Sequence, residues 1–187
     1  IEEGTPFATR YPDGSTELPD DDQSATMLET ADQLLTAAGY EHYEIANFAR
    51  PGCRSQHNCG YWQRDGYLGI GPGAHSFLKQ GYGLRWGNQS SFEDWADALQ
   101  HNSPAAIEQH QLSRAEALSE TIFLGLRMAD GISLDGFAEH FGERLEQRFA
   151  REIEQLQQAG LISCTTDSIA LTKQGMLLSN QVFVRFL

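Results

Sequence analysis

The sequence predicts an α/β protein in two parts, and two observations carry this prediction. Over residues 1–111, segments with helical apolar spacing alternate with short strand-like segments, and the first helix and strand lie within ten residues of each other. Over residues 112–187, the pattern predicts three helices, a β-hairpin and a closing helix, which is a winged-helix-like order. The chain has 187 residues, of which 40% are hydrophobic, so it can bury cores of this size.

Charge and composition exclude several classes of protein. The formal net charge is −13, which argues against a nucleic-acid partner because phosphate backbones need clustered Lys and Arg. No apolar run approaches the roughly 18 residues of a membrane span, and no signal peptide is visible. Three cysteines do not indicate a disulfide framework, so we expect a cytoplasmic location. The chain opens on Ile1 rather than Met, and we expect it to be part of a longer polypeptide.

The first elements follow from apolar spacing and from residues that start or end helices. Residues 4–23 are expected to form an exposed loop, and a helix is predicted over residues 24–39. The run Asp20-Asp21-Asp22 favours the start of this helix because a helix N-terminus attracts negative charge. Gly39 is a typical C-terminal stop, and residues 43–48 predict one strand.

The next segment mixes glycines, aromatic residues and polar residues. We expect residues 49–63 to be irregular and residues 67–77 to be a short apolar strand running into a glycine-rich turn. Residues 78–90 are predicted to be a hairpin or loop. Ser91, with Asp94 three residues later, then opens a helix.

Serine and threonine caps and glycine stops define the last part of the chain. They predict three helices, a hairpin and a closing helix over residues 113–131, 133–142, 143–160, 161–171 and 172–186. The third helix carries a net charge of −1 over residues 143–154, so it is a poor reader of DNA. We therefore expect a packing or lid domain.

One cluster has the residue types that bind a flat metal-containing ligand. The imidazole of His57 is a potential ligand for heme iron or another metal, Tyr61 and Trp62 offer stacking surface, and Asn58 offers a polar anchor. The alternative is that His57 is an ordinary surface residue. The other histidines away from this region lack such neighbours and are expected to be exposed: His42, His101, His110 and His140.

Other possible sites are less specific. The glycines of residues 69–73 allow a backbone to approach either a cofactor or a neighbouring strand, but they do not match the dinucleotide fingerprint. Cys53 and Cys59 with His57 are three potential metal ligands, although ordinary thiols are the simpler interpretation. No Ser-His-Asp or paired-carboxylate arrangement is visible, so we assign no catalytic residue.

Three segments in order resemble the oxygen-independent coproporphyrinogen III oxidase-like family of radical S-adenosylmethionine (SAM) proteins. They are YEIANFARPG at residues 43–52, HNCGYW at 57–62 and YLGIGPGAHS at 67–76. The resemblance implies that residues 1–111 are the C-terminal portion of a radical SAM partial (β/α) barrel. It implies that residues 112–187 are the family's winged-helix-like C-terminal domain.

Within that family, a His-Asn-x-x-Tyr-Trp motif marks the heme-chaperone branch and is implicated in heme binding. The match falls on His57, Asn58, Tyr61 and Trp62. The resemblance therefore implies a protein that binds heme and delivers it to a heme-acceptor protein. One alternative is a coproporphyrinogen III oxidase, which performs an oxidative decarboxylation to protoporphyrinogen IX. Another is a non-catalytic interaction module built on the C-terminal domain.

The resemblance also concerns SAM and an iron–sulfur cluster. In relatives, the backbone of the glycine-rich segment approaches SAM, which implies a cofactor-binding role for Gly71, Gly73, Ala74 and His75. The family's Cys-x-x-x-Cys-x-x-Cys motif for a 4Fe-4S cluster is not matched by the cysteines of this sequence. We therefore expect the cluster, which full-length relatives hold, to have no ligands in this chain.

Overall fold

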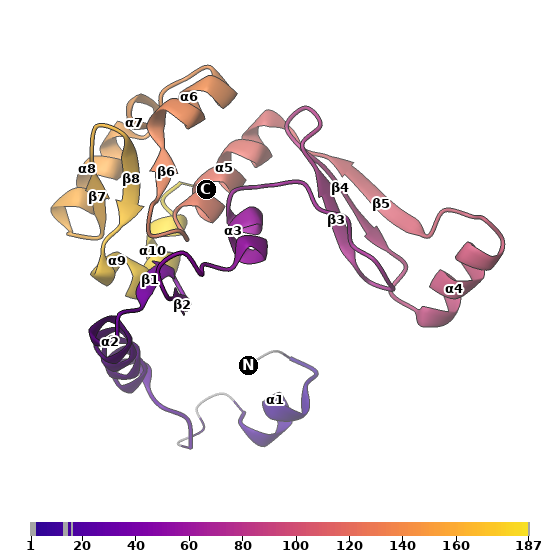
Figure 1. Cartoon of the computed structure of the whole chain (residues 1–187), viewed down its shortest axis with the longest axis horizontal. Helices are drawn as coiled ribbons and strands as arrows, with labels where there is room; N and C mark the ends of the chain where they lie inside the picture. The colour runs from indigo at the N-terminus through magenta and orange to yellow at the C-terminus, as the bar shows by residue number, and fades with distance from the viewer. Residues whose placement is uncertain (1–2, 13–14, 16, 187) are drawn as a thin grey trace.

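The computed structural model describes residues 3–12, 15 and 17–186, so Ile1 lies outside the described residues (Figure 1). Its architecture is mixed α/β, as the sequence predicts, with antiparallel sheets of strand order β1-β2, β3-β4-β5 and β6-β8-β7. Among the described residues, no helix is long and apolar enough to cross a membrane. Up to residue 111, the elements are α1 (Pro6–Arg10), α2 (Asp21–Ala37), β1 (Glu41–Glu44), β2 (Asn47–Ala49), α3 (Gln56–Trp62), β3 (His75–Leu78), β4 (Leu84–Asn88), α4 (Phe92–Gln100) and β5 (Ala106–Gln111).

The helix predicted from residue 24 begins three residues earlier. Asp20 is its N-cap, and its side chain and that of Gln23 form a reciprocal capping box. The helix ends before Gly39, which has the positive φ of +84° that glycine adopts readily. The predicted loop of residues 4–23 is wrong over α1, because the Thr5 side chain caps a short helix there.

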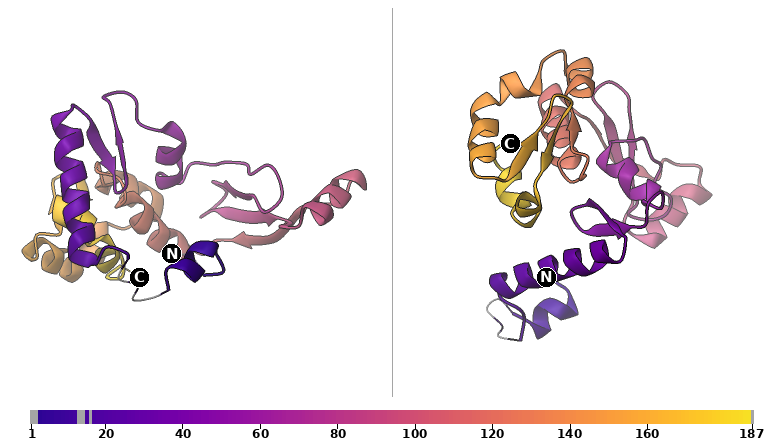
Figure 2. Two further views of the ribbon diagram at one scale, coloured as in Figure 1. Left: turned by 90° about the horizontal axis from the view of Figure 1, so that it is seen from below. Right: turned by 60° about the vertical axis from the view of Figure 1, so that its left-hand side comes forward.

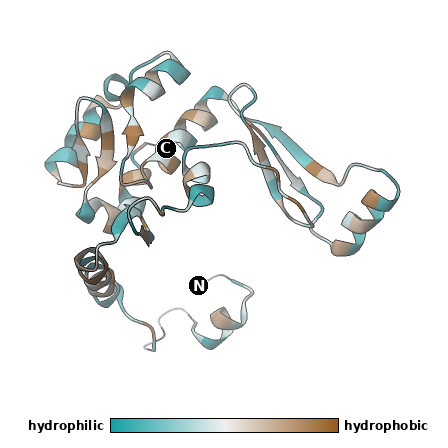
Figure 3. Cartoon of the chain, viewed as in Figure 1, coloured by the Kyte–Doolittle hydropathy of each residue, from teal (hydrophilic) through white to brown (hydrophobic). Residues whose placement is uncertain are grey.

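The apolar face of α2 is largely uncovered. Figure 3 shows hydrophobic residues along this helix, and Met27, Leu28 and Leu34 are 62%, 55% and 67% exposed. Asp32 connects the helix to the rest of the molecule through His42 of β1 and Lys173 of α9 (Lys173–Leu177). These two ion pairs link α2 to β1 and α9.

The single strand predicted over residues 43–48 is wrong, because the chain turns back and forms the hairpin β1–β2. At the turn, the Glu44 carboxylate accepts a hydrogen bond from the Ala46 backbone N–H at 3.3 Å. Ile45 donates its N–H to the Arg127 carbonyl at 3.0 Å, away from the hairpin. The composition of residues 43–48 alone favours a continuous strand, but this tertiary hydrogen bond draws Ile45 out of it.

The three-stranded sheet β3-β4-β5 forms an arm with α4 at its tip, which projects from the rest of the molecule in the views of Figures 1 and 2. β3 and β4 form a hairpin with Ser76 opposite Trp86, so its turn and second strand lie within the predicted segment 78–90 but its first strand begins earlier, at His75. The strand predicted at the start of residues 67–77 is wrong: it forms after the glycine turn, and Tyr67 makes a single bridge to Phe77. β5 was not predicted.

The remaining elements surround one hydrophobic core. They are α5 (Arg114–Gly125), β6 (Ile132–Ser133), α6 (Leu134–Phe141), α7 (Leu145–Arg148), α8 (Ala150–Gln158), β7 (Ile162–Cys164), β8 (Ser168–Leu171), α9 and α10 (Ser179–Phe183). The core includes Leu126 and Val182, each fully buried. The caps at Ser113, Ser133 and Thr172 and the hairpin β7–β8 are as predicted.

Three details of this part differ from the prediction. α5 ends at Gly125 rather than Gly131, and Gly131, with a φ of +72°, instead lies in the turn before β6. β6 was not predicted, and it pairs with β8. The predicted third helix is interrupted at Phe149, which separates α7 from α8.

The capping box of α5 predicts an acid-sensitive contribution to stability. Hydrogen bonds from Ser113, and then from His110, lower the pKa of Glu116 from 4.5 to about 2. Because the pKa is lower in the folded state, the contribution is present above pH 4.5 and is lost as the pH falls from 4.5 to about 2. Thermal unfolding of Glu116→Gln should therefore show a smaller fall in Tm across this range than the parent chain.

The control for this experiment is Glu139→Gln, which makes the same change of charge at an exposed position of α6. Circular dichroism at pH 7, 4.5 and 3 provides the measurement. An equal fall in Tm for the parent chain and Glu116→Gln would contradict the assigned role of this carboxylate.

Candidate functional site

The motif at residues 57–62 lies on α3, so the prediction of an irregular segment is wrong here. The Ser55 side chain caps the helix by accepting a hydrogen bond from the Asn58 N–H at 3.3 Å. Arg64 follows the helix with a φ of +55°, and Asp65 donates its N–H to the Gly60 carbonyl at 2.7 Å. Helical geometry fixes which motif side chains share a face.

His57 and Tyr61 share one face of α3 because they are four residues apart. Their rings meet edge to face, with centroids 4.6 Å apart, and Tyr61 contacts Tyr67 in the same manner at 4.6 Å. His57 is exposed, whereas burial raises the pKa of Tyr67. This face presents an accessible imidazole backed by two aromatic rings.

Asn58 and Trp62 lie on an adjacent face of the helix, again four residues apart. The guanidinium carbon of Arg127 lies 4.4 Å from the centroid of the Trp62 ring, which is a close cation–π contact. The indole Nε1 of Trp62 is buried and has no hydrogen-bond partner within the described part of the chain. The structure therefore brings the four predicted residues onto one short helix but divides them between two faces.

The predicted cofactor-binding segment is a loop that leads into β3. Gly71 and Gly73 have positive φ values of +108° and +68°, and a Cβ at Gly71 would meet nothing within 4 Å. Ala74 precedes the strand, and His75 pairs with Gly87, with its ring packed over that glycine. The backbone at Gly71 is open to a ligand, whereas Gly69 is tightly packed, since a Cβ there would lie 2.2 Å from the His75 carbonyl oxygen.

A buried polar cluster joins α3 and the arm to α5. Arg64, whose side chain is 10% exposed, donates to the Glu120 carboxylate at 3.1 Å and to the Tyr82 carbonyl at 2.7 Å. It also donates to Thr121 Oγ1 at 3.2 Å, and Glu120 accepts a second ion pair from Arg85. No local pattern indicated this cluster, because its members come from three separate segments of the chain.

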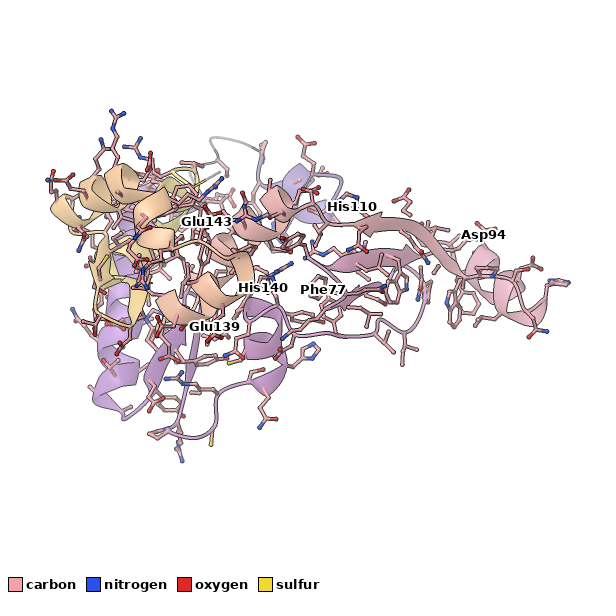
Figure 4. All side chains as sticks on the ribbon, turned by 90° about the horizontal axis from the view of Figure 1, so that it is seen from above. Phe77, Asp94, His110, Glu139, His140 and Glu143 are labelled. Carbon is pink, nitrogen blue, oxygen red and sulfur yellow. The ribbon has the colours of Figure 1, made fainter. Side chains whose placement is uncertain are left out.

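Beside this cluster is a cavity of about 580 Å³ between α3, β3, α5 and α6. Trp62 lines it on one side, and Phe137 and His140 of α6 line it on another. Figure 4 shows His140 and Phe77 close together in the middle of the molecule, although they come from different parts of the chain. Sequence patterns did not indicate this cavity.

The histidine predictions hold only in part. His101 and His110 are exposed, as expected. His42 is not, because its ring stacks on Phe48 at 4.1 Å and its Nδ1 lies 3.3 Å from Asp32. His140 is accessible but lines the cavity, and burial, followed by the charges of Arg64 and Lys79, lowers its pKa.

The cysteines do not form a site. Cys53 is exposed, Cys59 lies on α3 and Cys164 lies in β7, where burial raises the pKa of its thiol. No group of three or more His, Cys, Asp or Glu residues among those described has the arrangement that holds a metal ion. The described residues therefore do not fit a 4Fe-4S cluster.

Comparison of the sequence with known proteins identifies a matching family model and several relatives. Residues 112–178 match the family model described as the HemN C-terminal domain. The chain is 35% identical over 187 residues to the heme chaperone HemW of Bacillus subtilis, covering 100% of this chain and 48% of that protein. It is 32% identical over 182 residues to the heme chaperone HemW of Mycobacterium tuberculosis, covering 97% of this chain and 44% of that protein.

A vertebrate relative and a solved structure extend the comparison. The mitochondrial radical S-adenosyl methionine domain-containing protein 1 of Danio rerio is 30% identical over 190 residues, covering 97% of this chain and 43% of that protein. The coproporphyrinogen III oxidase HemN of Escherichia coli, a radical SAM enzyme, matches with a TM-score of 0.69 at 18% identity. The match covers 93% of this chain and 42% of that one and shows a shared fold. The chain spans about half the length of the curated relatives it matches.

Proposed function

Because this chain contains a HemN C-terminal domain and is homologous over its full length to the HemW heme chaperones, we propose that it is the heme-binding part of such a chaperone. The observation that carries the proposal is the face of α3 on which exposed His57 lies against Tyr61. Imidazole is a common axial ligand of heme iron, and aromatic rings offer a surface for the flat macrocycle.

In this proposal, His57 ligates the iron and Tyr61 contacts the edge of the macrocycle. Because Asn58 and Trp62 lie on the adjacent face, they act on heme through the position of α3 rather than as neighbours of the iron. An exposed ligand suits a protein that passes its cargo on, because an acceptor protein can approach the heme directly. Delivery to a heme-acceptor protein is therefore part of the proposal.

The rest of the chain fits the same family architecture. We assign residues 1–111 to the C-terminal portion of a radical SAM partial barrel and residues 112–187 to a winged-helix-like C-terminal domain. The uncovered apolar face of α2 supports the first assignment, because a helix of a complete barrel would bury such a face. A cytoplasmic location stays a prediction, and some relatives are named as mitochondrial proteins.

In this proposal, SAM and a 4Fe-4S cluster are cofactors of a full-length protein of this family. Together they would supply radical chemistry there. The described residues do not fit the cluster. The open backbone at Gly71 fits a ligand, so Gly71, Gly73, Ala74 and His75 are the residues we assign to SAM. The alternative function, oxidative decarboxylation of coproporphyrinogen III, is favoured by the fold shared with HemN.

Optical titration of the 187-residue chain with hemin tests the proposal. We expect a shifted Soret band that saturates at one heme per chain. Iron-free protoporphyrin IX should bind more weakly because it offers no metal to His57. A titration with hemin that does not saturate, or equal affinities for the two porphyrins, would contradict iron ligation by this chain. Decarboxylation of coproporphyrinogen III by a cluster-loaded, full-length protein would instead favour the oxidase.

A further inference from the structure

The cavity beside α3 has the size and walls of a small-molecule site. Its volume of about 580 Å³ lies within the roughly 300–1,000 Å³ typical of ligand pockets. Aromatic rings from three regions of the chain line it: Trp62, Phe77, Tyr82, Phe137 and Phe141. The Tyr82 and Phe141 rings are nearly parallel, with an interplanar angle of 5° and centroids 6.2 Å apart. A flat, apolar ligand suits these walls.

The charges around the cavity favour an anion, although the chain as a whole is acidic. Arg64 lines the cavity, whereas Glu120, which accepts from it and from Arg85, does not. The acidic residue of the lining, Asp130, pairs with Arg54, which is shared with Glu41. Among the lining residues themselves, the cations Arg64 and Lys79 outnumber the acidic residue, Asp130.

Further groups at the same cavity can interact with an anion. Lys79 lines it while pairing with Asp65 at 2.6 Å, and the His140 ring lies edge-on to Tyr82, with centroids 6.1 Å apart. Ser133 and Gly136, at the N-terminal end of α6, also line it, and the start of a helix favours negative charge. These groups come from β6, α6 and the loop after β3, so only the folded chain brings them together.

We propose that this cavity binds a planar aromatic anion, with its rings between the aromatic walls and its anionic group toward Lys79 and His140. This site goes beyond the proposed heme function, because Trp62 faces the cavity whereas His57 lies on another face of α3. The ligand is recognised by ring stacking and charge and needs no iron.

The probe for this site is 2-naphthoate, a planar aromatic carboxylate. We expect it to shift the indole N–H signal of Trp62 in nuclear magnetic resonance spectra of the 187-residue chain, assigned with Trp62→Phe. The chain has three tryptophans, and Trp86 and Trp95 do not line the cavity, so they serve as internal references. Shifts confined to Trp86 or Trp95, or no saturable shift at all, would overturn the proposal.

Charge removal tests the anionic part. The double variant Lys79→Gln/His140→Gln should bind 2-naphthoate about tenfold more weakly, because the charge of Lys79 and the imidazole N–H of His140 are both lost. The control Arg10→Gln/His101→Gln also removes one cation and one histidine, but away from the cavity, and should bind as the parent does. Equal affinity of the parent and the cavity variant, or of 2-naphthoate and the neutral 2-naphthylmethanol, would refute recognition of an anion.

Binding experiments on the same chain can test the heme proposal separately from the cavity. His57→Ala should leave naphthoate binding unchanged, because His57 does not line the cavity. Loss of naphthoate binding in His57→Ala would overturn the assignment of a separate site. Failure of hemin to bind, with naphthoate still bound, would reject the heme function alone.

Discussion

Arg64→Met is expected to lower the free energy of unfolding by about 3 kcal/mol, the range for breaking a buried ion pair. Methionine keeps the apolar length of the side chain but removes every hydrogen bond of the guanidinium. The Tyr82 carbonyl and Thr121 hydroxyl lose their Arg64 donor, and Glu120 keeps only Arg85. The loss is large because the Arg64 and Glu120 side chains are only 10% and 14% exposed.

Lys79→Met is the matched control for Arg64→Met. It removes one charge from an ion pair with Asp65 in which both side chains are more than half exposed, so its effect should stay within about 1 kcal/mol. Urea unfolding followed by circular dichroism measures both variants. Equal losses of stability would contradict the view that Arg64 joins α3 and the arm to α5.

His57→Ala is expected to weaken hemin binding at least about tenfold, because even the outer partners of metal ligands contribute 10- to 100-fold. The substitution replaces the only imidazole on α3 with a methyl group. Tyr61 is then left without a nitrogen ligand beside it to bind the iron. The side chain is exposed, so the fold should keep its Tm. Optical titration with hemin measures the change in affinity.

Trp62→Phe distinguishes the two faces of α3. Phenylalanine retains an aromatic ring beside Arg127, and Trp62 lies on the face that does not carry His57. This variant should therefore change hemin affinity by much less than His57→Ala does. If Trp62→Phe is the more damaging change, heme lies on the other face and the present assignment of Tyr61 is wrong.

Local signals in the sequence predicted much of the fold. Caps such as Ser113 and Thr172, and glycine stops such as Gly39 and Gly142, act within a few residues, so their effect is visible in the sequence. The elements that were missed depend on distant partners. β5 exists because it pairs with β4, and the β1–β2 turn is fixed by the Arg127 carbonyl.

The candidate site likewise combines features that local signals predict with features that depend on distant residues. The residue types on α3 identified His57 and its neighbours, and the helix explains why only Tyr61 shares its face. Composition did not predict this helix, because His, Asn and Gly are poor helix formers and Ser55 supplies the cap that starts it. The Arg64 cluster joins residues 18 to 57 positions apart, and the cavity lining extends from Trp62 to Phe141, so no local pattern reveals either.

The most direct test of the central claim is the optical spectrum of the His57→Ala chain with hemin, recorded before and after addition of imidazole. If His57 ligates the iron, the variant should lack the Soret band of the parent complex, and free imidazole should restore it. A His57→Ala spectrum identical to that of the parent, with no response to imidazole, would show that His57 is not the ligand and would contradict the proposed heme site.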